Sequence, residues 1–444
     1  MSILYQLIFI LILGVAGYIL SKRIKFLRRN ILLGKAEVRN DQPALRWKTM
    51  GLVALGQQKM FKRVVPAFLH LLIYVGFLVI NLEVLEFVLD GILGTHRLFA
   101  PYLGGLYSAA MNMFEFLAVG VLVSCFAFLI RRNVTKVPRL NKPELKGWPA
   151  MDANVILVIE IVLMFAILKM NAADQILAER GVGHYVLVGP LFFSGLFHPI
   201  FEGFSDTFLI FVERAAWWFH IIGILAFAIY VTYSKHLHIF LAFPNTWYSN
   251  LKPKGEMQNM PEVTNEVNMM LGIPAENAAE SPAEIGRFGA KDVNDLSWIN
   301  VLNAYSCTEC GRCTAECPAN ITGKKLSPRK IMMDVRDRAD EVGKSIDAGG
   351  PGFDDGKSLL GDYITKEELN ACTSCNACVE ACPVNIDPLS IILQMRRYVA
   401  MEESGTPAQW NAMFQNMETS FSPWKFSPSD RFNWAENVKD EEVK

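Results

Sequence analysis

Five long apolar runs dominate the first half of the chain. Spanning a bilayer takes about 20 mainly apolar residues in a helix. The runs that qualify lie at about 3–20, 64–88, 108–130, 153–170 and 212–234. From about residue 250 onward the chain is polar, charged and interrupted by Gly and Pro. The pattern predicts an all-α membrane domain of five transmembrane helices over 1–242, followed by a linker over 243–295 that is partly disordered or forms short helices.

The basic residues favour one orientation of these spans. The basic cluster next to the first run follows it and no A-x-A-like cleavage site is present, so we expect a true span and not a signal peptide. Segment 21–63 holds twelve Lys and Arg and segment 131–152 holds six, whereas the loops on the other side hold only Arg97 and Arg180. The positive-inside rule then places the N-terminus outside and the C-terminal half in the cytoplasm of a bacterium or archaeon. The apolar segment 184–206 is broken by prolines, and we expect a helix at the outer surface or a re-entrant segment.

Four histidines lie in or beside the second and fifth spans, namely His70, His220, His236 and His238. Ionisable residues at membrane depth are candidates for a functional role. A haem b with two imidazole ligands needs histidines on facing helices at the same depth. On one continuous helix, His220 and His238 would lie about 27 Å apart, which excludes a shared haem. Depth therefore pairs His70 with His238 or with His236. The alternative is that these histidines are interfacial and bond to the backbone.

Carboxylates gather near the outer ends of the second and third spans. Glu83 and Glu86 belong to the second span and Glu115 to the third. Two interpretations stay open: these groups exchange protons with a quinol, or they are solvated helix ends. Glu160 lies deeper, in the fourth span, where a carboxylate is costly unless it is paired.

The membrane half resembles the gamma subunit of respiratory nitrate reductase, a membrane cytochrome b, over about residues 1–240. The segment Phe68-Leu69-His70 is similar to that family's inner-haem ligand on the second span, and His220 and His238 are similar to its outer and inner ligands on the fifth. The resemblance implies an inner haem b bound by His70 and His238.

A second haem is less well supported by that resemblance. The family's remaining ligand falls ten residues after His70, where this chain has Ile80. Two possibilities follow from this difference. Either the chain binds a single haem, or His220 binds a second haem together with His96 or His198.

Charge and cysteine content narrow the possible partners and the compartment. The formal net charge is -1, and no basic patch is interleaved with aromatic residues, which argues against nucleic-acid binding. Eight of the nine cysteines fall between Cys307 and Cys382 in two groups of identical spacing, which indicates metal-binding thiolates on the cytoplasmic side. Cys125 stands alone in an apolar run, and we expect a small buried side chain there.

The cysteine motif C-x2-C-x2-C-x3-C-P occurs twice, and this doubled pattern is typical of ferredoxins with two [4Fe–4S] clusters. Three ligands from one motif surround one cluster, and the cysteine before proline crosses to the other. The expected ligands are Cys307, Cys310, Cys313 and Cys382 for the first cluster, and Cys372, Cys375, Cys378 and Cys317 for the second. Zinc sites use two C-x2-C pairs instead. We therefore expect a small, mainly α-helical ferredoxin domain of the bacterial type over 296–400.

The C-terminal half also resembles the iron–sulfur subunits of heterodisulfide-reductase-like oxidoreductases. The similar segments are 298–313, 326–330, 422–424 and 431–435. In longer relatives the last segments lead into catalytic domains with Cys-Cys-Gly motifs. No cysteine follows the second motif here, so the resemblance implies a separate cytoplasmic iron–sulfur partner that carries the catalytic site. The tail over 401–444 would then dock that partner.

Together these features imply an electron-transfer subunit of a quinone-linked respiratory oxidoreductase. Electrons would pass between menaquinone or ubiquinone, haem b, the two clusters and the cytoplasmic partner, with membrane lipid around the spans. Two alternatives stay open. One is a haem-free, membrane-anchored ferredoxin that contacts quinone, and the other is a redox-sensing or energising component of a membrane machine.

Overall fold

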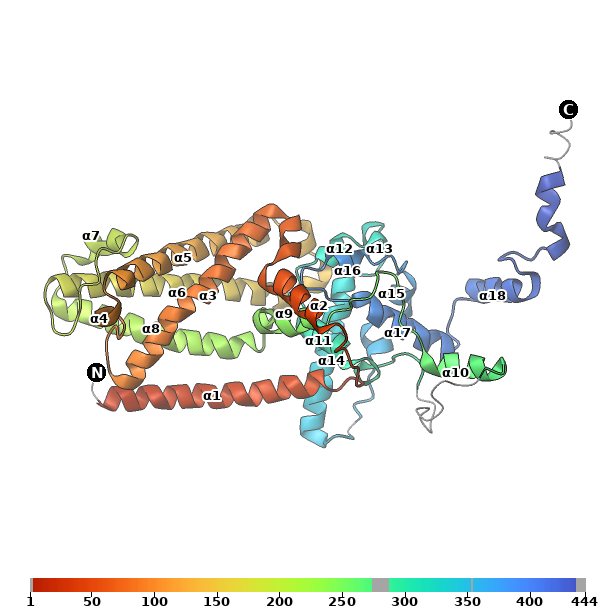
Figure 1. Ribbon diagram of the computed structural model, residues 1–444, viewed down its shortest axis with the longest axis horizontal. Helices are drawn as coiled ribbons and strands as arrows, with labels where there is room; N and C mark the ends of the chain where they lie inside the picture. Colours follow the sequence, from red (N-terminus) through yellow and green to blue (C-terminus); the bar gives the residue numbers. More distant parts are fainter. Residues whose placement is uncertain (1–2, 274–286, 353, 437–444) are drawn as a thin grey trace, which may run out of the picture.

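Five long helices confirm the predicted membrane domain (Figure 1). The computed structural model describes residues 3–273, 287–352 and 354–436, and within these ranges it contains helices and no β-strand. Each of the five is long and apolar enough to cross a membrane. They are α1 (Ile3–Ile31), α3 (Val64–Leu93), α5 (Gly105–Leu129), α6 (Trp148–Glu179) and α8 (Asp206–Val231).

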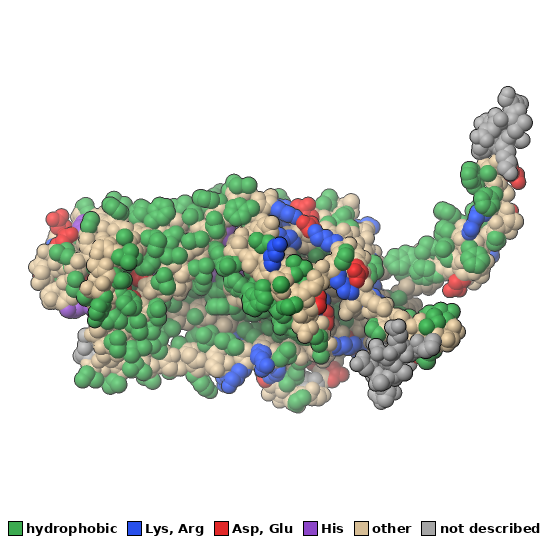
Figure 2. All heavy atoms as spheres, viewed as in Figure 1, with side chains coloured by type: hydrophobic (Ala, Val, Ile, Leu, Met, Phe, Trp, Pro, Cys, Tyr) green, Lys and Arg blue, Asp and Glu red, His purple; other side chains and the backbone are tan. Residues whose placement is uncertain are grey.

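Small residues allow these helices to pack closely. A Cβ atom on Gly76 of α3 would lie 2.7 Å from the Val121 side chain of α5. One on Gly223 of α8 would lie 2.7 Å from the Leu163 side chain of α6. In lipid, close contact between helix surfaces replaces the hydrophobic drive for association. Cys125 is fully buried in the same bundle core, as expected. The outward surface of the bundle is largely apolar, whereas charged side chains gather over one end (Figure 2).

The two ends of the bundle differ in what covers them. At the far end, short helices α4 (Ala100–Leu103) and α7 (His198–Phe201) lie beside the ends of the long helices (Figure 1). The expected surface helix over 184–206 is wrong in part, because only η6 (Ser194–Phe197) and α7 are helical there. Pro199 lies in the first turn of α7, where a missing backbone N–H breaks no helical hydrogen bond.

At the other end, which we call the domain end, the chain packs against the C-terminal half. This end carries α2 (Pro43–Met50) and α9 (His238–Trp247), with the short turns η2 (Gln58–Lys62) and η7 (Lys235–Leu237). The fifth long helix stops at Val231. His220 and His238 are therefore not on one continuous helix, and the assumption behind their expected 27 Å separation was wrong. The chain turns because the Ser234 side chain accepts a hydrogen bond from the His236 amide and starts a new turn.

The C-terminal domain is built from short helices that are capped by local side chains. Ser297, Ser327, Thr365 and Asp387 each accept a hydrogen bond from an amide in the first turn of the helix they precede. These bonds satisfy amides that have no partner inside the helix. The helices are α11 (Trp298–Tyr305), α12 (Arg312–Ala315), α13 (Pro318–Ile321), α14 (Pro328–Gly349), α15 (Lys366–Asn370), α16 (Ala377–Ala381) and α17 (Pro388–Met401).

One apolar core joins this domain to the domain end of the bundle. It contains Leu27 of α1 and Val231 of α8 together with Val301, Ile331 and Ile391 of the C-terminal domain. Burying these side chains stabilises the contact by about 2 kcal/mol for each fully buried aliphatic side chain. The two halves therefore pack directly against each other at this core.

Linker and tail have different surroundings. The linker contains α10 (Pro261–Met270), and residues 274–286 lie outside the described residues. Helix α9 crosses the expected boundary at residue 242. The tail contains α18 (Ala408–Ser420), which has no buried residue and points away from the rest of the molecule (Figure 1).

Buried ion pairs add to the contact between the C-terminal domain and the domain end of the bundle. Lys235, just after the fifth long helix, pairs with Glu309 of the C-terminal domain, and their side chains are only 8% and 2% exposed. Arg336 of α14 also bonds to Glu309, at 2.8 Å. Burial by itself would raise the pKa of Glu309, but Lys235 and Arg336 outweigh it and hold that pKa below its usual value.

Removing the Glu309 charge should destabilise the protein. In Glu309→Gln the buried Lys235 and the half-buried Arg336 both lose their shared carboxylate and keep only Asp152 and Asp337, which costs about 3 kcal/mol of unfolding free energy. The pKa of Glu309 is lower in the folded protein than in the unfolded chain. Its contribution to the free energy of unfolding is therefore complete above the unfolded-state pKa of about 4.3 and is lost as the pH falls through the folded-state pKa. Denaturant unfolding in detergent at several pH values measures both effects. Glu367→Gln is the matched control, because its pair with Lys325 is 63% and 69% exposed and should contribute less than about 1 kcal/mol. Equal losses in the two variants would contradict this account.

Candidate functional site

The first set of cysteines surrounds one small cavity in the C-terminal domain. Cys307, Cys310, Cys313 and Cys382 all line it, as does Pro383. Backbone amides point at two of the sulfurs: Glu309 N lies 3.4 Å from Cys307 Sγ, and Ile386 N lies 3.3 Å from Cys382 Sγ. Such bonds stabilise thiolates and tune cluster potentials. Cys382, from the second motif, thus lies with the three cysteines of the first.

The second set is brought together in the same crossed manner. Cys317 and Cys375 are both electrostatic neighbours of Cys372, and Cys317 is also a neighbour of Cys378. Ser374 N lies 3.4 Å from Cys372 Sγ. Cys375 is exposed, whereas the other three are buried or half-buried. This set therefore has one edge at the surface of the molecule.

Both cysteine loops repeat the same backbone turns. Glu309 and Gly311 have positive φ angles of 55° and 70°, and the equivalent Ser374 and Asn376 have 54° and 62°. A left-handed residue on each side of the second cysteine curls each loop so that its sulfurs converge. Such angles are uncommon for residues other than glycine. Nothing in the cysteine spacing alone revealed these turns.

Burial raises the proton affinity of these thiols. It raises the pKa of Cys307 and of Cys378 to about 12, and that of Cys382 to about 11. Only thiolates ligate iron, so cluster binding must release protons from this site. An arginine lies beside each set. Arg312 lines the cavity of the first set and bonds to the Lys59 carbonyl at 3.3 Å, and Arg396 bonds to the Cys372 carbonyl of the second set. Their charge favours the anionic state of a bound cluster.

A histidine group lies at the domain end, next to the first set of cysteines. The ring centroids of His70 and His238 are 6.4 Å apart. His70 Nδ1 lies 2.9 Å from Gln57 Oε1, and His238 Nδ1 lies 3.1 Å from the Lys235 carbonyl. Because both oxygens can only accept, each ring donates from Nδ1 and leaves Nε2 free as a ligand atom.

The two rings have the chemistry that a haem iron would need. His70 and His238 would hold the iron through Nε2, because Nδ1 of each ring is already hydrogen-bonded. His236 contacts His238 at 5.4 Å and Phe227 at 5.5 Å instead of sharing this arrangement. Burial lowers the pKa of His238, and it lowers that of His236 to about 3. Both rings are therefore neutral near pH 7, the form that binds iron.

The other candidate haem histidines lie toward the far end. His220 is 1% exposed, and neither ring nitrogen has a partner in good hydrogen-bond geometry. Its ring packs edge-on against Phe87 at 5.9 Å. His96 bonds to Asp174 at 2.7 Å through Nε2, and Nε2 of His198 is buried without a partner. No ring contact joins His220 to either histidine within the described residues.

The three predicted carboxylates are all inside the protein, so their interpretation as solvated helix ends is wrong. Glu83, Glu86 and Glu115 are 2%, 4% and 2% exposed. Glu86 accepts hydrogen bonds from Tyr107 Oη at 2.7 Å and from Phe99 N at 2.9 Å. Helix packing and the far-end loops cover them, which no hydropathy pattern reveals.

Several residues around these carboxylates were not singled out from the sequence. The Arg97 side chain bonds to Asp174 at 2.8 Å, to Asn171 at 3.1 Å and to Tyr107 at 3.3 Å. Arg97 and Asp174 are 6% and 1% exposed. The one indication of these residues in the sequence was Arg97, a single arginine in the loop between the second and third spans. We call the buried and half-buried polar side chains here the far-end network, which consists of Glu83, Glu86, Asp90, His96, Arg97, Tyr107, Glu115, Asn171, Asp174, Tyr185, Glu213 and Arg214.

Comparison with protein families identifies the cysteine-rich half. Residues 306–386 match the family described as 4Fe-4S dicluster domain. The C-terminal half contains a 4Fe-4S dicluster ferredoxin domain. The arrangement of the cysteines agrees with such a domain, because the last cysteine of each motif lies with the first three of the other. No solved structure matches the chain significantly.

Curated relatives share both halves of the chain. It is 25% identical to a probable iron–sulfur-binding oxidoreductase, FadF, of Bacillus subtilis, over 98% of this chain and 61% of that protein. It is 27% identical to an EtfAB:quinone oxidoreductase of Syntrophomonas wolfei, over 91% of this chain and 56% of that protein. A probable membrane-anchored ferredoxin of Chromohalobacter salexigens is 32% identical over 34% of this chain and 24% of its own length. The chain thus spans about 60% of the length of the first two. The comparisons support a multi-pass, membrane-anchored iron–sulfur protein of the oxidoreductase type.

The crossed arrangement predicts how the clusters respond to substitution. Anaerobically purified protein should contain about eight non-haem irons and eight sulfides per chain. Cys317→Ser should damage the cluster held by Cys372, Cys375 and Cys378 more than the other, because its sulfur lies with theirs. Electron paramagnetic resonance of the reduced protein separates the two signals. Cys125→Ser is the control and should leave both unchanged. Equal loss of both signals in a folded Cys317→Ser protein would contradict the ligand assignment.

Proposed function

We propose that this chain passes single electrons between a membrane quinone and two [4Fe–4S] clusters, by way of a haem b held by His70 and His238. The η2 turn, which lies between the histidine group and the first cysteine loop, carries the proposal. Arg312 lies in that loop, and its guanidinium bonds to the Lys59 carbonyl of η2. The residue before η2 is Gln57, the partner of His70. One short turn of chain therefore touches both proposed cofactor sites.

The residues at the domain end have defined tasks in this proposal. A haem bound here would supply reversible one-electron chemistry between quinone and clusters. His70 and His238 offer Nε2 as axial ligands, and Gln57 and the Lys235 carbonyl orient the two rings through Nδ1. An apolar core surrounds Val231 and the cysteines. Apolar surroundings would lower the reorganisation energy of each electron transfer, because few dipoles need to reorient.

The clusters set the order of the route. Cysteines of both sets, Cys307, Cys317 and Cys382, belong to the core shared with the bundle. The first loop also contacts the η2 turn through Arg312, so the first cluster would lie nearer to the proposed haem. Cys375 is exposed, so the second cluster would exchange electrons with a partner in the surrounding solution. Since 21–63 and 131–152 are basic and flank the domain end, that end is assigned to the cytoplasm and the far end to the outside.

Sequence similarity suggests two candidates for the cytoplasmic electron-transfer partner. A cytoplasmic iron–sulfur subunit with Cys-Cys-Gly domains is one candidate, and similarity to heterodisulfide reductase subunits of Methanosarcina species supports it. The name of the Syntrophomonas wolfei relative adds EtfAB as a second candidate and supports quinone as the membrane substrate. Exposed aromatic residues on the tail, including Trp410 and Trp424 at 37% and 68% exposure, would provide the docking surface.

A haem-free alternative is favoured by one observation. The similarity to a probable membrane-anchored ferredoxin agrees with a chain in which the spans only anchor the clusters or couple them to a membrane machine. The histidine geometry distinguishes this alternative from the main proposal, because a chain without haem has no need for two buried imidazoles with free Nε2 atoms.

Absorption spectroscopy of histidine variants tests the proposal. Full-length protein made with haem available should show a low-spin b-type spectrum. His70→Ala and His238→Ala should each abolish it, because each removes one of two protein ligands to the iron. His236→Ala is the matched control and should retain it, since its ring packs on Phe227. A complete absence of haem absorption in the wild type would overturn the haem route and favour the anchored ferredoxin.

A further inference from the structure

Arg329 is a buried cation beside the first set of cysteines. Its side chain is 0% exposed and lines the same cavity as those four residues. Nη1 donates to the Arg139 carbonyl at 2.6 Å, and Nη2 donates to Glu144 Oε1 at 2.7 Å. Nε has no hydrogen-bond partner within the described residues. Because a buried N–H without an acceptor costs about 1–3 kcal/mol, this hydrogen suits the sulfurs of a bound cluster, which accept hydrogen bonds.

The membrane half holds Arg329 against the first cysteine loop. Its two partners, Arg139 and Glu144, both belong to the loop between α5 and α6. On the other side lies Gly311, which has a φ angle of 70°. A Cβ atom there would clash with the Arg329 guanidinium and would lie 2.9 Å from the Arg139 carbonyl oxygen. A glycine between the second and third cysteines therefore lets the guanidinium approach the loop closely.

Three further cations lie beside the first set. Arg312 lines the cavity, and Arg139 donates a hydrogen bond to the Cys310 carbonyl. Lys59 lies close enough to Cys382 to interact with its sulfur electrostatically. Within the described residues, none of the three forms an ion pair with a carboxylate; their hydrogen bonds go to carbonyl and amide oxygens. Their charges are therefore not compensated locally.

Two carboxylates lie close to the first set, and both are already paired. Glu309 interacts with a sulfur of the set, but Lys235 and Arg336 both pair with it. Glu144 pairs with Arg329 and is not among the residues that line the cavity. The positive member of that pair therefore lies nearer to the cluster. A bound first cluster would thus have surroundings with an excess of positive charge.

Among the described residues, the second set has no such excess. Arg396 interacts with Cys372 and Asp387 interacts with Cys378, so one cation is offset by one carboxylate. Cys375 is exposed, and water near it also stabilises added negative charge. However, a fixed charge in a protein, at an effective dielectric constant of about 20, acts about four times more strongly than in bulk water. Four fixed cations therefore outweigh water at one exposed ligand.

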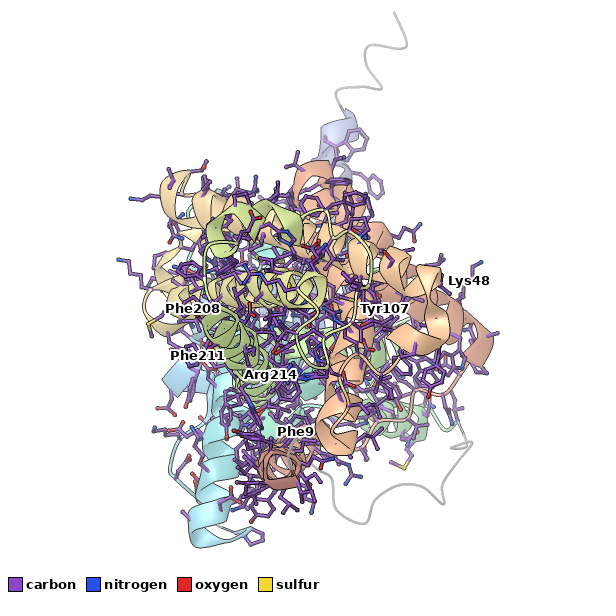
Figure 3. The ribbon with its side chains drawn as sticks, turned by 90° about the vertical axis from the view of Figure 1, so that its left-hand side faces the viewer. Phe9, Lys48, Tyr107, Phe208, Phe211 and Arg214 are labelled. Carbon is purple, nitrogen blue, oxygen red and sulfur yellow. The ribbon has the colours of Figure 1, made fainter. Side chains whose placement is uncertain are left out.

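Cations at the far end do not add to this difference between the clusters. Arg97 pairs with Asp174, and Arg214 pairs with Glu213. In the view onto the far end, Arg214 lies near the middle of the bundle (Figure 3). The C-terminal domain lies at the opposite end of the molecule (Figure 1). Only the cations of the domain end lie beside the clusters.

We propose that Arg329 tunes the first cluster through its charge and its free Nε hydrogen, and that the four cations at this site give that cluster the higher reduction potential of the two. The inference rests on the proposed function for the exchange of electrons between the clusters. A [4Fe–4S] core that is reduced from +2 to +1 gains one negative charge, which cations stabilise. The electron comes from the other core, which is oxidised from +1 to +2, and no proton is transferred. An electron shared by the two clusters would therefore reside mainly on the first.

A redox titration of the full-length protein measures both potentials. Anaerobically purified protein is reduced stepwise with dithionite, and electron paramagnetic resonance follows the signal of each cluster. Comparison with Cys317→Ser identifies the signal of the second cluster, because that variant damages the second cluster more. In the wild type, the first cluster should become reduced at the higher potential.

Variants of the ion pair test the role of Arg329. Arg329→Met removes the charge and the Nε hydrogen, and should lower the preference of the electron for the first cluster about tenfold, which is about 59 mV for one electron. Arg329→Lys keeps the charge and should recover only part of this shift. Glu144→Gln removes the partner carboxylate and should raise the potential of the first cluster. If the pair were merely structural, Arg329→Met and Glu144→Gln would shift that potential in the same direction.

Two further variants serve as controls. Arg396→Gln is the matched change beside the other set of cysteines and should lower the potential of the second cluster alone. Lys59→Gln leaves the pair of Arg329 and Glu144 in place. It should lower the potential of the first cluster alone, and it tests the cations even if Arg329→Met fails to fold.

The outcomes distinguish this inference from the proposed function. A first cluster whose potential equals or lies below that of the second, or variants of Arg329 and Lys59 with the wild-type potential, would overturn the inference. Full recovery in Arg329→Lys would overturn the part assigned to the Nε hydrogen. The titration needs neither haem nor quinone. A protein without haem would therefore contradict the proposed function, while the two potentials would still decide the inference.

Discussion

The low polarity of the membrane interior and of the shared apolar core governs this structure. A charge placed there must find a partner or be neutralised, because an unpaired buried charge costs a large share of the net stability of a domain. At the domain end this requirement produces the contact of Lys235 and Arg336 with Glu309. That contact fixes the first cysteine loop against the bundle. At the far end it produces the network around Arg97, with Asp174 as its ion-pair partner.

The shared apolar core turns two separate modules into one electron path. A ferredoxin domain tethered only by a linker would sample many distances from the membrane. Here Val231 and Leu237 of the membrane half pack in the same core as Cys307 and Cys382. The histidine pair His70 and His238 lies beside this core, so its distance to the cysteine loops is set by packing and not by diffusion. Because transfer between cofactors depends steeply on distance, a rigid contact suits this proposed role.

The two ends of the bundle carry different polar groups. The domain end has imidazole nitrogens and cysteine sulfurs, which are groups that can bind metals. The far end has carboxylates, a histidine and a tyrosine, held together by buried hydrogen bonds and ion pairs. Helices α3 and α8 run between the two ends, and Phe87 of α3 meets His220 of α8 between them.

The amino-acid sequence alone determined the features that depend on local spacing. The five spans follow from the length of apolar runs, and the two cysteine motifs follow from their repeat, because membrane thickness and cluster geometry each demand a fixed number of residues. The tertiary structure decided which distant groups meet. The break after Val231 brings His238 to His70, and helix packing buries Glu83 with Arg97. Local patterns cannot show such pairings, since side chains that are far apart along the chain come together only when the helices pack.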